Sequence, residues 1–143
     1  MTENEKKTID LAGLDTVAGA NAGFDVMLFH PATREDLGIV FTVFGKDSDR
    51  FQEVARTQQK RRLNKMSKGG FRSATGSLSP EEMEQESIDL LAACTIGWSD
   101  NFVINGGPVQ FSIEAARRIY KQFPWIKEQI DDAMGDRSNF IKR

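Results

Sequence analysis

Residues 24–44 read FDVMLFHPATREDLGIVFTVF and hold two runs of strand-forming residues. The runs extend from Phe24 to Phe29 and from Leu37 to Phe44, and a short polar link that contains Pro31 separates them. Aromatic and β-branched side chains favour strands, whereas proline fixes φ and removes a backbone donor, which favours a turn. The pattern therefore predicts a β-hairpin. Both faces of the second run carry apolar side chains, so we expect part of it to be covered on both sides.

Helices are predicted in most of the chain after this hairpin. The clearest start is Ser79-Pro80-Glu81-Glu82, where the serine can cap the helix, the proline suits its first position and the second glutamate can reach back to the serine amide. We expect this helix to end at Gly97. The other predicted helices begin near Ser48 or Asp49, at Ser112 and at Pro124.

A second, small hairpin is predicted around Asn105-Gly106, because this pair tolerates the positive φ of tight hairpin turns. A hairpin is not stable alone and must pack on other elements. The expected fold class is therefore α+β and dominated by helices, with the N-terminal β-hairpin packed on about four helices.

The length of 143 residues fits one domain with a real core. Residues 1–8 are polar, and we expect them to be disordered. Residues 68–79 contain three glycines and four Ser or Thr residues, which predicts a flexible internal loop. The expected organisation is a single domain over residues 9–143 that contains this loop.

Composition excludes several classes of protein. The net charge of −2 gives no global attraction to nucleic acid or to an anionic membrane. The longest apolar runs are a few residues, whereas a membrane-spanning helix needs about 20. Residues 1–7 lack the apolar centre of a signal peptide, so we expect a cytoplasmic protein.

Catalytic and metal-binding patterns are also missing from the sequence. Cys94 is the only cysteine and falls on the apolar face of its predicted helix, as a small core residue would. His30 is the only histidine and lies beside Pro31 in the predicted turn. Asp47 and Asp49 suit helix capping better than calcium binding. We therefore expect no enzymatic activity, no metal and no cofactor.

Charge is distributed unevenly along the chain. Residues 46–72 hold 9 Lys or Arg against 3 Asp or Glu, whereas residues 1–45 and 73–143 each have a net charge of −4. Six cations occupy about three and a half turns of one predicted helix: Arg56, Lys60, Arg61, Arg62, Lys65 and Lys68. Three interpretations stay open: a solvated helix face, a docking surface for an acidic protein or another copy, and a nucleic-acid site. The last lacks interleaved aromatic residues.

Large aromatic residues raise a second question about interactions. We expect Trp98 and Trp125 to pack in the core. Phe140 follows a predicted helix end within a short charged tail, and it would be exposed on a free chain end. Phe140 is therefore predicted to dock back on the domain or into another subunit. Together with the six cations it completes the set of candidate partner-binding residues.

The order of several motifs resembles the tail assembly chaperones of bacteriophages with long, non-contractile tails. The first segment that carries the likeness contains His30-Pro31-Ala32-Thr33, Leu37-Gly38-Ile39 and Val43-Phe44-Gly45-Lys46-Asp47-Ser48. The second contains Trp98, Gly106-Gly107-Pro108-Val109, Phe111-Ser112, Phe123-Pro124-Trp125-Ile126 and Asp136-Arg137-Ser138-Asn139-Phe140. Residues 56–79 match nothing in this pattern, which leaves the role of the basic stretch open.

The resemblance implies a role in virion assembly in the cytoplasm of an infected bacterium, without a place in the mature virion. Proteins of this family are thought to coat the tape-measure protein, keep it soluble and help to recruit tail-tube subunits. Opposite charges in the middle and the flanks would steer copies together, so we expect a homo-oligomer that dissociates as salt rises. The alternative function is a small nucleic-acid-binding or regulatory protein that uses the basic helix over residues 56–68.

Overall fold

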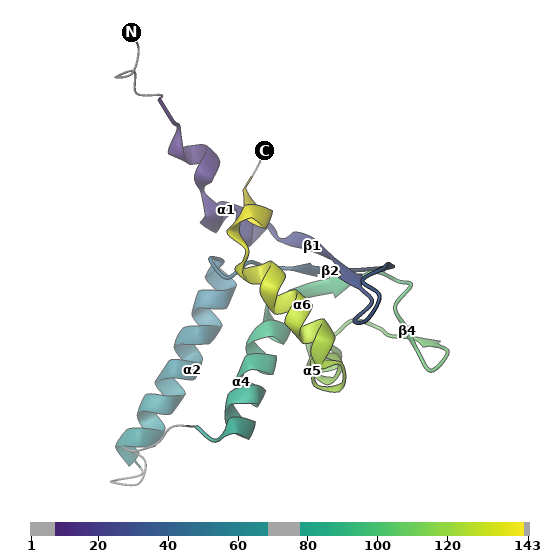
Figure 1. The fold of residues 1–143 in the computed structure, drawn as a ribbon. Helices are drawn as coiled ribbons and strands as arrows, with labels where there is room; N and C mark the ends of the chain where they lie inside the picture. Colours follow the sequence, from purple (N-terminus) through teal and green to yellow (C-terminus); the bar gives the residue numbers. More distant parts are fainter. Residues whose placement is uncertain (1–7, 69–77, 142–143) are drawn as a thin grey trace.

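The computed structural model describes residues 8–68 and 78–141 (Figure 1). This part of the chain forms five α-helices, a three-stranded antiparallel sheet and a two-stranded hairpin, as the predicted helix-dominated α+β class requires. The elements in chain order are η1 (Leu11–Leu14), α1 (Thr16–Ala22), β1 (Phe24–Phe29), β2 (Asp36–Val43), α2 (Asp49–Lys68), α4 (Pro80–Ala93), β3 (Thr95–Trp98), β4 (Val103–Ile104), β5 (Gly107–Pro108), α5 (Ile113–Gln122), α6 (Pro124–Gly135) and η2 (Arg137–Phe140).

The predicted N-terminal hairpin is confirmed as β1 and β2. Val26 pairs with Phe41 across the hairpin, and Phe41 pairs in turn with Trp98 of β3. The third strand is a correction, because α4 ends at Ala93 with Cys94 as its C-cap, and the residues from Thr95 to Gly97 belong to β3 instead of the helix. Strand β3 has only four residues, and its partner β2 lies about fifty residues earlier, so local sequence carries little signal for it.

The core lies between one face of the sheet and the helices beneath it (Figure 1). Helix α6 packs on β1 and β2, and α4 packs on β3 and α5. Inward side chains of alternate strand residues meet apolar helix residues there. The largest fully buried members of this core are Leu28, Phe41, Val43, Ile88, Tyr120, Ile130 and Met134. Trp98 and Trp125 pack against the same cluster and are half-buried.

The outward face of the sheet differs from the expectation for β2. Met27, Phe29 and Ile96 are exposed on this side, and Val40 is half-buried. In the described part of the chain the three packed helices α4, α5 and α6 all lie on the inner side (Figure 1). The outward residues Val40 and Thr42 of β2 are half-buried and alternate with the buried Phe41 and Val43, so the expected cover on both faces is found only in part.

Other local predictions are confirmed. Ser79 and Glu82 form the reciprocal capping box at the start of α4. The small hairpin of β4 and β5 turns at Asn105 and Gly106, whose φ values are 51° and 80°. Both residues thus adopt the left-handed conformation that such turns need. The predicted disorder at residues 1–8 and the predicted loop at residues 68–79 fall almost entirely outside the described residues.

Candidate functional site

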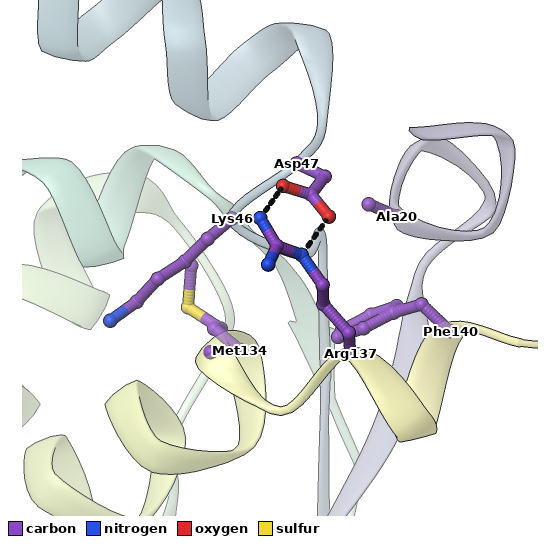
Figure 2. A pocket seen from close by; sticks show the side chains of 7 residues that line it. Ala20, Lys46, Asp47, Met134, Arg137 and Phe140 are labelled. Carbon is purple, nitrogen blue, oxygen red and sulfur yellow. Dashed lines mark hydrogen bonds and ion pairs between the residues drawn. The ribbon is translucent and has the colours of Figure 1, made fainter. Parts of the chain in front are cut away.

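A bidentate ion pair joins the chain's C-terminal segment to the residues just before α2 (Figure 2). Arg137 Nε lies 2.7 Å from Asp47 Oδ2, and Arg137 Nη2 lies 3.0 Å from Asp47 Oδ1. Lys46, the preceding residue, pairs with Asp131 of α6 at 2.8 Å. We call this region the C-terminal junction and define it by Gly45, Lys46, Asp47, Arg137 and Phe140.

The Asp47 carboxylate is held in its charged form. Hydrogen bonds from the Arg137 guanidinium, then from the Thr16 hydroxyl, lower the pKa of Asp47 below its usual value. The guanidinium itself is 71% exposed, so solvent screens the pair and its contribution to stability is about 1 kcal/mol or less. The junction therefore orients the segment more than it stabilises the fold.

Phe140 supplies the apolar part of the junction. Its side chain is only 6% exposed and makes an edge-to-face contact with Phe24, at a centroid distance of 5.6 Å. A Cβ atom at Gly45 would lie 2.9 Å from the Phe140 ring, and one at Gly19 would lie 1.7 Å from the Phe140 carbonyl oxygen. The prediction that Phe140 docks back is met within its own chain, so this side chain is not available to a partner.

The C-terminal junction brings together the two segments that carried the family resemblance. Residues 45–48 come from the end of the first segment, and residues 137–140 from the end of the second. Ser48 is fully buried, and its Oγ accepts the Phe51 N–H at 3.1 Å, so Ser48 is the one of the two predicted start positions that caps α2. A cavity of about 160 Å³ remains at the junction. These contacts hold the C-terminal segment against the start of α2.

The five predicted cations whose side chains the structure describes do not form one surface. Arg62 and Lys65 turn toward α4, where they pair with Glu86 at 2.5 Å and with Glu82 at 2.9 Å. Arg56 and Lys60 lie one turn apart on the opposite side of α2, beside a shallow groove. Arg61 is exposed on the flank of the helix, and the side chain of Lys68 is outside the described residues.

The only histidine and the only cysteine have structural surroundings. His30 Nδ1 accepts the backbone N–H groups of Ala32 and Thr33 at 3.0 and 3.1 Å, which shapes the β1–β2 turn. Cys94 is fully buried, and burial raises the pKa of its thiol to about 12. A thiol of this kind is a poor nucleophile at neutral pH.

Two exposed apolar surfaces that were not predicted from the sequence are present among the described residues. The first is the arm, which we define by Ile9, Leu11, Leu14 and Val17. Ile9 is 67% exposed and Leu11 is 71% exposed, and η1 contains no buried residue. In Figure 1 this segment leads away from the sheet and the helices. The spacing of four large apolar side chains within nine residues was the available signal.

The second surface is the open sheet face, which we define by Met27, Phe29, Val40 and Ile96. Residues 25–29 alternate between exposed and buried positions in the structure, but residues 26–29 are all apolar, so the sequence holds no alternation that could have identified this face. Gln129 of α6 donates to the Phe29 carbonyl and accepts the Phe29 N–H, both at 2.9 Å. The Gln129 side-chain amide therefore forms, at one end of β1, the two hydrogen bonds that a neighbouring strand would form with the free edge. The face of the sheet, more than its edge, is therefore the open surface.

Among the described residues there is neither a cluster that could hold a metal nor a helix that could span a membrane. No group of three or more His, Cys, Asp or Glu side chains is placed there to hold a metal ion. No helix of residues 8–68 and 78–141 combines the length and the apolar character needed to cross a bilayer.

Comparison with known proteins adds no relative. No family model, no curated protein and no solved structure matches this chain.

Proposed function

We propose that this protein is a binding protein of the tail assembly chaperone type, which holds the tape-measure protein soluble and promotes assembly of the tail tube. The observation that carries the proposal is the open sheet face. Large apolar side chains gathered on one exposed face, with a polar rim, are typical of sites that bind another protein. The resemblance in the order of motifs supports the tape-measure protein as the client.

The chemistry of the open sheet face favours a particular kind of client segment. Asp25 and Asp36 lie on the same side of the sheet as Met27 and Phe29, and both aspartates are exposed. An apolar strip between two carboxylates suits an amphipathic helix whose apolar stripe is flanked by Lys or Arg. The tape-measure protein is a long helical client, so such stripes can recur along it and engage several copies.

Further parts of the proposal rest on the resemblance alone. Tail-tube subunits are the second proposed partner. The protein acts in the cytoplasm of the infected bacterium and leaves before the virion is mature. It performs no catalysis and needs no cofactor, because shielding an apolar client requires only surface.

Co-expression with the tape-measure protein of the same phage tests the proposal. We expect the wild-type chain to raise the soluble fraction of the tape-measure protein. Met27→Lys should abolish the gain, since it places a cation among the apolar side chains of the open sheet face. Lysine is well tolerated on an edge strand, so the variant should still fold.

Met83→Lys is the matched control. Met83 is 58% exposed on α4, against 46% for Met27 on the sheet, and it lies outside the open sheet face. This variant should solubilise the client as the wild type does. An unchanged soluble fraction with the wild-type chain, or equal activity of the two variants, would contradict the proposal.

A further inference from the structure

The arm is anchored at one end and exposed at the other. The Gly45 N–H donates to the Ala20 carbonyl at 3.1 Å, and Asn21 exchanges two hydrogen bonds with Asp49. These contacts fix the C-terminal end of α1 to the start of α2. The apolar residues of η1 lie beyond this anchor, where no described residue buries them. They are thus presented outward at a fixed place.

The arm also carries its own charge pattern. Asp10 Oδ1 accepts the Ala12 N–H at 2.9 Å, and Asp15 Oδ1 accepts the Ala18 N–H at 3.0 Å. These caps hold both carboxylates beside Leu11 and Leu14 and leave their second oxygens without a hydrogen bond from another described residue. The arm is therefore an acidic surface with an apolar centre.

The outer side of α2 has the complementary pattern. Arg56, Lys60 and Leu63 lie at i, i+4 and i+7, so they share one face of the helix. Leu63 is 56% exposed, and neither cation forms an ion pair with another described residue. A shallow groove of about 370 Å³ runs along this side beside Thr57. Asp49 and Glu53 line its N-terminal end, where Asp49 bonds with Asn21 and Glu53 pairs with Arg50. We call this surface the outer face of α2.

We propose that the arm of one copy docks on the outer face of α2 of a second copy. Leu11 and Leu14 pack against Leu63, while Asp10 and Asp15 face Arg56 and Lys60. Apolar contact and the opposite charges both contribute to the attraction, and the charges also set the register and speed the encounter.

The two surfaces are different parts of the same chain, so the contact is heterologous. Reciprocal exchange of arms closes a dimer, and one-way repetition gives a ring or a row of copies. A row would suit an extended client. The contact itself needs no client, so it can be tested separately from the proposed function.

Sedimentation velocity of the full chain tests this contact. The wild type should form oligomers at about 0.05 M salt and dissociate toward about 0.5 M, because salt screens exposed charges. Leu11→Ser with Leu14→Ser gives an arm variant, and Arg56→Glu with Lys60→Glu gives an α2 variant. Each should raise the dissociation constant by about tenfold or more, which is about 1.4 kcal/mol. Arg118→Glu, at an exposed cation of α5, should leave it unchanged.

Mixing the two defective variants separates a direct contact from a folding defect. The α2 variant keeps an intact arm, and the arm variant keeps an intact outer face of α2. The mixture should therefore form a complex of two chains at a concentration where each variant alone is monomeric. A monomeric wild type at low salt, variants that assemble like the wild type, or a mixture that stays monomeric would each overturn the proposal.

Discussion

Asp47 joins three parts of the chain through one carboxylate. The carboxylate accepts two hydrogen bonds from the Arg137 guanidinium and one from the Thr16 hydroxyl. Asp47 does not cap α2 as its position in the sequence suggested, because Ser48 is the cap. The ion pair spans 90 residues of sequence, and no local pattern could have predicted it.

The lowered pKa of Asp47 makes part of the protein's stability depend on pH. A carboxyl whose folded pKa lies below its unfolded value stabilises the fold above the unfolded value, and this contribution is lost as pH falls through the folded pKa. Asp47→Asn should therefore lower the free energy of unfolding by about 1 kcal/mol or less at pH 7. The difference from wild type should shrink below about pH 4.

Urea denaturation at several pH values between about 7 and 3 measures this difference. Asp100→Asn, at an exposed turn residue, is the control for loss of one charge. A gap between wild type and Asp47→Asn that stays constant across this range would contradict the role given to the carboxylate.

At the scale of elements, the sequence predicted what depends on local signals. The hairpin of β1 and β2, the capping box of α4 and the turn at Asn105-Gly106 all rest on residues close together in the chain. Strand β3 and helix α1 were missed, because β3 is defined by its pairing with β2 and α1 by its packing on η2. The small residues of α1 favour a helix only weakly, but they allow α1 to pack closely against η2.

The contact between α1 and η2 depends on the absence of a side chain at Gly19. A Cβ atom there would lie 1.7 Å from the Phe140 carbonyl oxygen, which is backbone and cannot rotate away. Gly19→Ala should therefore separate the two elements and lower the free energy of unfolding by about 1–3 kcal/mol. Chemical denaturation measures the loss. Gly13→Ala is the control, because no atom lies within 4 Å of a Cβ at that position; equal effects of the two changes would refute the close approach.

The division of charge on α2 predicts weak binding to nucleic acid. Arg62 and Lys65 already pair with acids of α4, which leaves Arg56 and Lys60 with Arg61 as exposed cations that form no ion pair within the described residues. A continuous six-cation site would give a slope of log affinity against log salt near −5. We expect a slope no steeper than about −3 in titrations of duplex DNA. A slope near −5 would restore the nucleic-acid alternative.

At the scale of the whole molecule, the sequence could predict which residues are unusual, but it could not predict which apolar surfaces are exposed. The basic stretch and Phe140 were visible as unusual residues, but their neighbours decide their roles. Phe140 packs against its own chain, and two of the five described cations, Arg62 and Lys65, pair with acids of α4. The open sheet face emerges only once β3 adds Ile96 beside the hairpin and all packed helices lie on the other side.

The central claim is that the open sheet face binds a client protein directly. Calorimetric titration of a purified helical segment of the tape-measure protein into the chain tests it without the complications of a cell. We predict saturable binding that Met27→Lys weakens by about tenfold or more and that Met83→Lys leaves unchanged. Absence of binding by the wild type, or binding that Met27→Lys does not weaken, would contradict the account.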